Sequence, residues 1–190
     1  MTTITIFGNG NMGSAIGGLF SSGGAEVSHV THAGSEPITG DIVVLAVPYE
    51  SLQDIVKDYA DQFAGRIVVD ITNPLDFDTF DSLKVPAGSS AAAELQNALP
   101  HSKILKAFNT NFAATLSDQQ VGINPTTVLV AGDDDAAKQT FSGAVVAGGL
   151  SVVDVGKLVR AHELEALGFL QLTLANNDTI AWSAGFALVR

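Results

Sequence analysis

The chain has 190 residues and a mass of 19.6 kDa, enough for one well-filled domain and short for two. It is 46% hydrophobic and 15% charged, too apolar for a disordered chain. Nine basic against 20 acidic residues give a net charge of −11, which argues against nucleic-acid or anionic-membrane binding. The absence of cysteine excludes disulfides and thiolate chemistry. Because no apolar run approaches the ~18 residues of a membrane span and no signal peptide is visible, we expect a cytoplasmic protein with one domain over residues 1–190.

Strand-like and helix-like segments alternate along the chain. Short apolar or β-branched runs predict strands at Thr3–Phe7, Glu26–His32, Asp41–Pro48, Arg66–Thr72, Lys103–Phe108, Thr127–Ala131 and Leu150–Val155. Helical spacing of apolar residues predicts helices at Ser14–Ser22, Ser51–Phe63, Ser89–Leu99, Ala136–Ala147 and Lys157–Ala175. The tail Ile180–Val189 is expected to pair at a sheet edge. This alternation predicts the α/β class: a doubly wound, mostly parallel sheet in three layers, the Rossmann fold.

The connection between the second and third predicted strands is unusually short. Only Ala33–Gly40 separates them, and this stretch is rich in Gly, Ser, Pro and Thr. A parallel crossover normally needs a dozen or more residues with a helix. We therefore expect that helix to be short or absent, which would leave one flank of a cofactor site open.

A glycine-rich loop follows the first strand and opens the first helix. Its residues are Gly8, Asn9, Gly10, Asn11, Met12 and Gly13. The G-x-G-x-x-G spacing is weak evidence alone, but strand, loop, helix and second strand occur in the required order. Gly8 would make the tight turn, Gly10 would let the backbone approach a pyrophosphate, and Gly13 would let the helix pack on the strand. The amides of Asn11 and Met12 would donate to the phosphates at the helix N-terminus. The alternative is a mere strand-to-helix turn.

The end of the second strand normally distinguishes NAD from NADP. NAD-binding proteins usually place an acidic residue there, and NADP-binding proteins an arginine. This chain has neither; it has Thr31 and His32. Because no carboxylate would repel a 2′-phosphate, we favour NADP, held near Thr31 and His32. An exposed loop histidine is the alternative for His32.

Other strand ends carry residues suited to a nicotinamide pocket. They are Ala46, Val47, Pro48, Asn73, Pro74 and Asn109. Ligands of open α/β sheets bind at the carboxyl ends of the strands, where the two asparagine amides would lie beside a nicotinamide. Ordinary turns at strand ends are the alternative, because Asn and Pro are common there.

Five ordered segments resemble one family. They are Phe7–Gly13, Ala46–Glu50, Asp70–Leu75, Lys106–Thr110 and Gly132–Asp135. Together they are similar to the NADPH-dependent oxidoreductases of deazaflavin coenzyme F-420 and to the cytosolic domains of membrane ferric reductases. The resemblance covers nearly the whole chain. It implies hydride transfer between NADP(H) and a flat deazaflavin or flavin, with the segments Ala46–Pro48, Asn73–Leu75 and Asn109–Thr110 at the nicotinamide pocket.

The sequence departs from that family at the second strand. Members typically have Ser-Arg there and a longer helical crossover, whereas this chain has Thr31-His32 and the short loop. The departure weakens the transfer of the NADP preference. Membership would also leave the acceptor unidentified.

Few other side chains in the sequence are suited to catalysis. Tyr49 and Tyr59 both lack a lysine four residues later, which excludes short-chain dehydrogenase chemistry. Lys106 and Lys157 are the lysines closest to the predicted site, but each is expected to be solvated or ion-paired. This agrees with hydride transfer between stacked rings, which needs alignment and water exclusion more than an acid or base.

Two clusters of metal-ligating residue types occur in the sequence, and neither has the pattern of a metal site. His162, Glu163 and Glu165 do not share one helical face well, so His162 is expected at the surface or an interface. Asp133–Asp135 is explained as acidic residues at a helix N-terminus. We therefore predict no metal site.

The sequence predicts an NADP(H)-binding oxidoreductase with a small flavin-, deazaflavin- or quinone-like acceptor. A non-catalytic NADP(H) sensor and a redox subunit acting on a partner protein's cofactor remain alternatives. Trp182 and Phe186 are expected either to wall a flat-ring pocket or to pack in a dimer. The apolar last helix and tail make a homodimer plausible.

Overall fold

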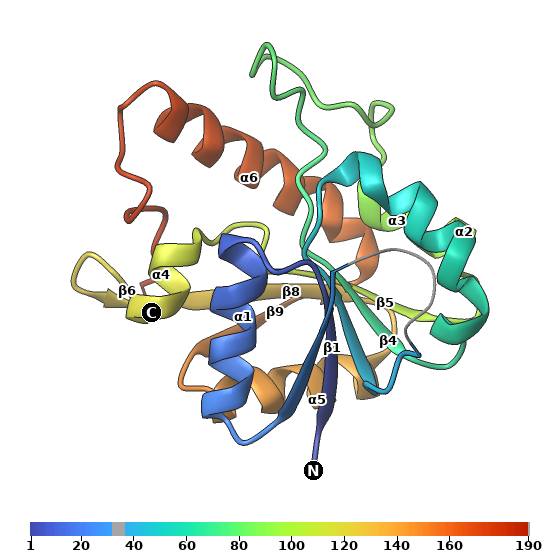
Figure 1. Ribbon diagram of the computed structural model, residues 1–190. Helices are drawn as coiled ribbons and strands as arrows, with labels where there is room; N and C mark the ends of the chain where they lie inside the picture. Colours follow the sequence, from blue (N-terminus) through green and yellow to red (C-terminus); the bar gives the residue numbers. More distant parts are fainter. Residues whose placement is uncertain (32–36, 190) are drawn as a thin grey trace.

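The computed structural model describes residues 1–31 and 37–189 and shows a seven-stranded sheet with helices on both faces (Figure 1). The strands are β1 (Thr3–Phe7), β2 (Glu26–Val30), β3 (Ile42–Leu45), β4 (Ile67–Asp70), β5 (Lys103–Ala107), β8 (Thr127–Gly132) and β9 (Ser151–Gly156). Their order is β2-β1-β3-β4-β5-β8-β9, and all neighbours are parallel except β5 and β8. The doubly wound, mostly parallel sheet is therefore confirmed.

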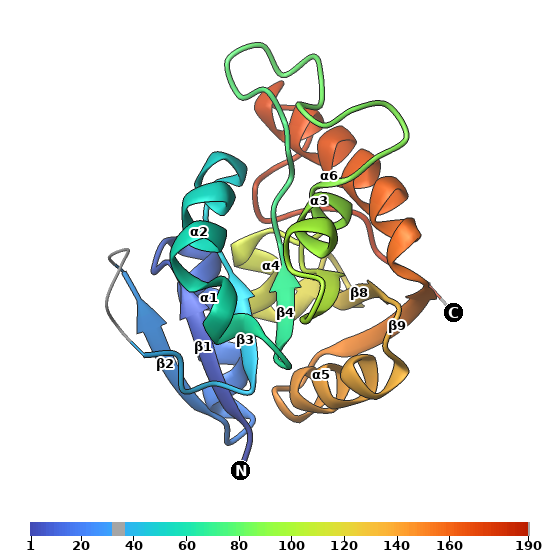
Figure 2. The ribbon, with the colours of Figure 1, turned by 90° about the vertical axis from the view of Figure 1, so that its right-hand side faces the viewer.

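The helices cover the sheet in two layers (Figure 2). They are α1 (Asn11–Ser22), α2 (Leu52–Phe63), α3 (Ala91–Ala98), α4 (Ala113–Asp118), α5 (Asp135–Ala147) and α6 (Ala161–Asn176), with short 3-10 turns at Tyr49–Ser51 and Leu158–Arg160. On one face α1 and α5 bury a cluster in which Phe20, Phe108 and Phe141 meet edge to face. On the other face α2 and α3 pack on a second cluster that contains Phe7 and Tyr59.

The central strands are buried on both faces. Every residue of Ile42–Leu45 and Ile67–Asp70 is buried, as expected of unbroken apolar runs in a covered parallel sheet. The chain runs from β1 to β2 at one edge and then returns past β1 to β3. The direction of winding thus reverses between β1 and β3, and this reversal creates a crevice at the carboxyl ends of these strands.

The link between β2 and β3 agrees with its short sequence where it is described. Thr31 and residues 37–41 contain no helix, and His32 lies outside the described residues. The prediction that one flank of the cofactor site is open therefore stays untested.

The sequence-based elements were wrong in two places. The described part of the tail, 180–189, forms no strand; instead the Phe186 amide donates to Gln171 Oε1 of α6 at 3.1 Å, and this holds the tail against the helix. The helix α4 and the hairpin Gln120–Val121 with Asn124–Pro125 were not predicted, because six residues and two pairs are too short to show a period. Among the described residues, no helix is long and apolar enough to span a membrane.

Candidate functional site

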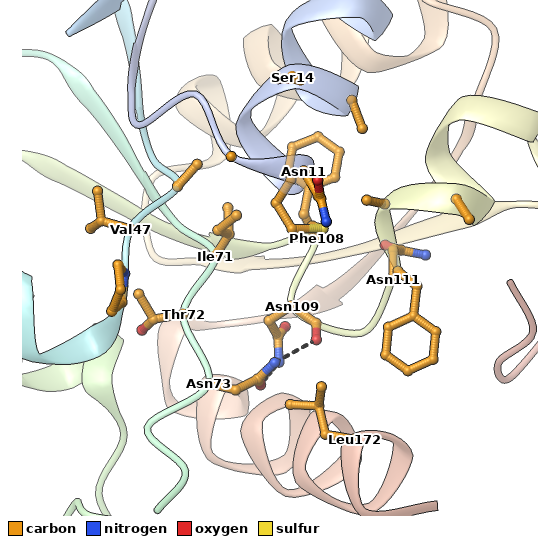
Figure 3. Close-up of a pocket in the computed structure, with 18 of the residues that line it drawn as sticks. Asn11, Ser14, Val47, Ile71, Thr72, Asn73, Phe108, Asn109, Asn111 and Leu172 are labelled. Carbon is orange, nitrogen blue, oxygen red and sulfur yellow. Dashed lines mark hydrogen bonds between the residues drawn. The ribbon is translucent and has the colours of Figure 1, made fainter. Parts of the chain in front are cut away.

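A cavity of about 910 Å³ opens at the carboxyl ends of β1, β3, β4 and β5 (Figure 3). The central strands, the first turn of α1, α4, α6 and the tail all contribute to its wall. The residues that line it are Gly10, Asn11, Met12, Ser14, Ala15, Ala46, Val47, Pro48, Tyr49, Ile71, Thr72, Asn73, Phe77, Phe108, Asn109, Asn111, Phe112, Ala113, Ala114, Ser117, Leu172 and Trp182. The structure thus brings together eight of the predicted site residues, from segments as far apart as Gly10 and Asn109.

The glycine loop forms the α1 side of this pocket. Gly8 has φ +96°, and a Cβ there would overlap the carbonyl oxygen of Ala46. A Cβ on Gly13 would lie 2.5 Å from Gly8 O, whereas one on Gly10 would meet no atom within 4 Å. The absence of a side chain at Gly8 therefore permits the turn, and its absence at Gly13 permits α1 to pack closely on the loop. Gly10 leaves open space beside the backbone.

The N-terminus of α1 has no side-chain cap. Gly10 is the N-cap residue, and because glycine has no side chain the first amides of the helix have no side-chain acceptor. Unsatisfied amides and the helix dipole favour an anion at this position. A helix N-terminus that lines a cavity can receive a phosphate group from the ligand.

His29 supports the glycine loop from behind and was not recognised in the sequence. Its Nδ1 lies 3.0 Å from Gly8 O, a contact that joins β2 to the glycine loop. Its ring also packs so closely on Gly17 of α1 that a Cβ there would lie 2.9 Å from His29 Nε2. A histidine on an exposed edge strand gives no local signal of this contact, because its partner is 21 residues earlier.

The two strand-end asparagines are bonded to each other (Figure 3). Asn73 Nδ2 donates to Asn109 O, and Asn109 Nδ2 donates to Asn73 Oδ1, both at 2.9 Å. Asn109 Nδ2 also donates to Leu164 O of α6 at 2.8 Å. Their amide donors therefore fasten the ends of β4 and β5 to α6, an arrangement that the sequence did not predict.

Three buried oxygens in the pocket wall have no hydrogen-bond partner within the described chain: Thr72 Oγ1, Asn109 Oδ1 and Asn111 Oδ1. The three residues are between 4% and 8% exposed. Buried polar atoms are normally paired, and an orphan suggests a missing partner. A ligand with an N–H or O–H donor would suit this part of the wall.

Aromatic rings form the outer wall. Phe112 and Trp182 contact each other with ring centroids 5.0 Å apart, and Trp182 is half exposed. Phe77, also half exposed, lines the pocket from the long loop after β4. Of the two interpretations of the tail aromatics, Trp182 fits the pocket wall, while Phe186 is not among the lining residues. Flat apolar surfaces of this kind suit a planar ring.

A buried ionic cluster lies behind the strand ends. Lys106 Nζ is 2.8 Å from both Asp70 Oδ2 and Glu165 Oε1, and all three residues are fully buried. Lys106 also donates to the carbonyl of Thr72, a pocket residue. Burial raises the pKa of the Glu165 carboxyl above its ordinary value, and the neighbouring Asp70 carboxylate raises it too. The attraction of Lys106 opposes this shift and does not cancel it. Of the two earlier alternatives for Lys106, the ion pair is correct and solvation is wrong.

Glu165 also holds α3. Its Oε2 accepts from the Ala91 amide at 3.0 Å, at the N-terminus of that helix. Nδ1 of the neighbouring His162 donates to Ser89 O at 3.1 Å. Glu165 is therefore a structural junction of α6, α3 and β5.

The remaining predicted residues lie away from the cavity wall. Asn9 is exposed in the glycine loop, and its carbonyl accepts from Ser14 Oγ at 3.0 Å. Pro74 is buried behind the strand end, and Thr31 is exposed at the end of β2. Lys157 is exposed and does not line the cavity. His32 lies outside the described residues, so its predicted role stays a prediction.

The acidic run Asp133–Asp135 has structural partners. Asp134 caps α5 by accepting from the Ala137 amide at 2.8 Å, and Asp133 Oδ1 accepts from the Leu158 amide at 3.1 Å. The helix-terminal interpretation of these residues is confirmed. The described residues contain no group of three or more His, Asp or Glu side chains arranged to hold a metal.

Comparison with known proteins confirms the family resemblance. Residues 34–74 match the model of a family described as NADP oxidoreductase, coenzyme F420-dependent. The chain is 30% identical to the F420-dependent NADP reductase of Methanocaldococcus jannaschii over 67% of its own length and 59% of that protein. It is 34% identical to rat metalloreductase STEAP3 over 79% of its own length and 28% of that protein.

A solved structure matches over the full length. It is a crystal structure from Arthrobacter sp. FB24, provisionally assigned as an F420-dependent NADP-reductase, with 25% identity, a TM-score of 0.85 and complete coverage of both chains. The chain therefore shares the fold of this protein from end to end. It spans little more than half of the archaeal reductase and about a quarter of the metalloreductase.

Proposed function

Starting from this resemblance to the F420-dependent NADP oxidoreductases, we propose that the chain is an oxidoreductase that binds NADP(H) and reduces or oxidises a flat-ring acceptor, a flavin, deazaflavin or quinone. The observation that carries the proposal is a single cavity in which an uncapped helix N-terminus, unpartnered amide oxygens and aromatic rings meet. A phosphate, a carboxamide and a planar ring each have a suitable partner there. The names of two relatives support NADP as the dinucleotide.

The residues of the cavity fit the dinucleotide at both ends. The amides of Asn11 and Met12 would receive the pyrophosphate, since Gly10 leaves the space beside them open. The unpartnered Asn109 Oδ1 and Asn111 Oδ1 would accept from the carboxamide N–H₂. Bound NADP(H) supplies a nicotinamide ring able to give or take a hydride. Thr31 and His32 remain the predicted contacts of the adenine ribose and its 2′-phosphate.

The chain's own contribution to the reaction would be to align the two rings and to exclude water from the cavity. Ala46, Val47 and Ile71 form an apolar floor, and Phe112 with Trp182 forms the facing wall. Two stacked rings held in register need little further catalysis, because positioning accounts for much of the barrier reduction. Tyr49 lines the cavity, but its hydroxyl donates to Glu94 Oε2 at 2.6 Å. Burial and this hydrogen bond raise the pKa of the hydroxyl above its ordinary value. Tyr49 therefore stays protonated and does not serve as a base.

The test is a parallel titration with NADPH and NADH. Trp182 is the only tryptophan of the chain and lines the cavity, so nicotinamide binding should quench its fluorescence. We expect quenching by NADPH at lower concentrations than by NADH, followed by NADPH oxidation with at least one flavin, deazaflavin or quinone. Preference for NADH would refute the NADP assignment and leave the dinucleotide site. Binding of neither would refute the whole proposal.

Binding of NADPH without its oxidation by any acceptor would favour the alternative function, a non-catalytic NADP(H) sensor. A partner protein's cofactor as acceptor has one observation in its favour, because the chain matches only 28% of a longer metalloreductase. NADPH oxidation that appears only with a co-purified partner would support that second function.

A further inference from the structure

The last helix carries a glycine where glycine is unfavourable. Gly168 is buried inside α6, between Ala161 and Asn176. Glycine destabilises a helix interior relative to alanine, because its backbone loses more freedom on folding. Gly168 does not line the cavity, so contact with a ligand does not account for it. Close packing against a neighbouring element is therefore the reason to look for.

The space beside Gly168 is filled by the bonded asparagine pair at the ends of β4 and β5 (Figure 3). A Cβ on Gly168 would overlap Asn73 Oδ1, and it would lie 2.9 Å from Asn73 Cγ and 3.0 Å from Asn109 Nδ2. The end of an asparagine side chain can often move aside. Here it cannot do so freely, because the two amides are bonded to each other and to the carbonyls of Asn109 and Leu164. The missing side chain at Gly168 thus lets α6 approach closely enough for these bonds to form.

Two backbone carbonyls fix the orientation of the paired amides. Asn73 Nδ2 donates to Asn109 O, and Asn109 Nδ2 donates to Leu164 O. A backbone carbonyl only accepts, so each side chain must turn its N–H₂ group toward that oxygen. If the Asn109 amide were flipped, Asn109 Oδ1 would face Leu164 O, and the two acceptors would repel each other. Asn109 Oδ1 is therefore turned away from Leu164 O, and it is buried without a partner in the described chain.

Asn111 has the same arrangement two residues later. Its Nδ2 donates to Thr127 O at 3.1 Å, and its buried Oδ1 has no partner among the described residues. Asn109 and Asn111 both line the cavity. Two amide oxygens with fixed orientation match a ligand group that has two N–H donors. A ligand without these donors would leave both oxygens unpaired, which is costly in a buried site.

We propose that Gly168 is a positioning residue, which lets α6 hold the Asn109 amide with its oxygen free for the N–H₂ group of the nicotinamide carboxamide, so that the cavity selects dinucleotides with this group. The inference rests on the proposed function and names the ligand feature that the pocket recognises. Gly168 acts through Asn73 and Asn109 and does not contact the ligand. Gly168→Ala would displace the Asn73 amide, release the Asn109 amide from its fixed orientation, and leave the glycine loop unchanged.

Two analogues of NADP⁺ separate recognition of the N–H₂ group from general binding. The 3-acetylpyridine analogue has a methyl group in place of the carboxamide N–H₂, whereas the thionicotinamide analogue keeps the N–H₂ and has sulfur in place of oxygen. Calorimetry would give the dissociation constants of both analogues and of NADP⁺. For the wild type we expect the acetylpyridine analogue to bind roughly tenfold more weakly than NADP⁺, and the thionicotinamide analogue to stay within about threefold of it.

Gly168→Ala should remove most of this selection. We expect the ratio of the dissociation constants of the acetylpyridine analogue and NADP⁺ to fall to about threefold or less, since the oxygen is no longer held in place. Adenosine 2′,5′-bisphosphate, which has no nicotinamide, should bind the variant and the wild type equally. Gly143→Ala is the matched control, because it is the same change inside α5 and its Cβ would meet no atom within 4 Å. It should keep the full ratio.

A second substitution tests whether the overlap with Asn73 is the cause. Adding Asn73→Ala to Gly168→Ala vacates the space and leaves Asn109 Nδ2 bonded to Leu164 O at 2.8 Å. The double variant should therefore regain part of the ratio. If Gly168→Ala alone does not fold, a folded double variant with a restored ratio supports the same contact. A double variant that does not fold, or that folds and regains none of the ratio, would overturn the proposal.

The remaining outcomes separate this inference from the proposed function. An equal loss of affinity for every ligand in Gly168→Ala, the bisphosphate included, would show a purely structural role and overturn the positioning role. A wild type that binds NADP⁺ and its acetylpyridine analogue equally would overturn the recognition of the N–H₂ group and keep the dinucleotide site. Binding of none of the dinucleotides by the wild type would refute the proposed function itself.

Discussion

Replacing Lys106 by Met should destabilise the protein strongly at neutral pH. The change removes the cation shared by Asp70 and Glu165 and leaves two buried carboxyls without their partner. Taking one partner from a buried pair costs about 3–5 kcal/mol, and apolar packing of Met offsets little of this, since two acids remain. The loss is a large fraction of the stability of an ordinary domain.

The pH dependence gives the prediction its specific signature. The pKa of Glu165 is already raised by burial, and without Lys106 the protonated form is favoured further. A group whose pKa is raised on folding contributes stability below its unfolded pKa, and this contribution is lost as pH rises through the folded value. The deficit of Lys106→Met should therefore be greatest near pH 7 and shrink as pH falls toward ~4.5.

Urea unfolding followed by circular dichroism at pH 7 and pH 5 measures both effects. With a slope of ~2 kcal/mol/M, a loss of ~4 kcal/mol lowers the midpoint at pH 7 by ~2 M. The double variant Lys106→Met with Glu165→Gln serves as control, and it should recover part of the loss because one buried charge is gone. A midpoint for Lys106→Met within ~0.5 M of the wild type at pH 7 would show that the cluster is solvated in solution.

Substitutions at three other residues and one measurement of the oligomeric state test the remaining structure. Gly8→Ala should raise the dissociation constant for NADPH at least tenfold, since its Cβ overlaps Ala46 O; unchanged quenching of Trp182 would contradict this. His29→Ala should weaken NADPH binding about fivefold by freeing Gly8 O, and His29→Asn should restore part of it if the hydrogen bond is the cause. Glu165→Gln should flatten the loss of stability that the raised pKa predicts as the pH rises above the ordinary carboxyl range; a curve parallel to the wild type would locate that titration elsewhere. Light scattering at micromolar concentration should detect the predicted homodimer, and a monomer mass at all concentrations would refute it.

The glycine loop was predictable because its requirements are local. Each of Gly8, Gly10 and Gly13 serves a contact within a strand, a turn and a helix that follow each other directly in the chain. The strand ends were predictable for a related reason, because parallel strands place their carboxyl ends at one edge of the sheet. The structure accordingly places Ala46, Val47 and Pro48 in the cavity wall with Asn73 and Asn109.

The ionic cluster was not predictable from local pattern, although the sequence holds a signal. Lys106 interrupts an apolar strand, and Glu165 interrupts the apolar stripe of the last helix. A charge in a doubly covered strand requires a partner. The partner is 59 residues away, however, and its identity follows only from the packing of α6 on β5. The His29 contact to Gly8 was missed for the same reason, since β2 and the loop meet only through the sheet.

These polar contacts explain how one wall of the cavity is built. The helix α6 is fastened to the strand ends by Glu165 on Lys106, by Leu164 O on Asn109, and by Gln171 Nε2 on Thr110 O at 3.2 Å. Gln171 Oε1 in turn holds the tail that carries Trp182. Buried polar contacts fix position more narrowly than apolar packing does, because they fail when a donor and acceptor separate by about an ångström. The spacing between the strand-end side and the Trp182 side of the cavity is therefore set by the position of α6.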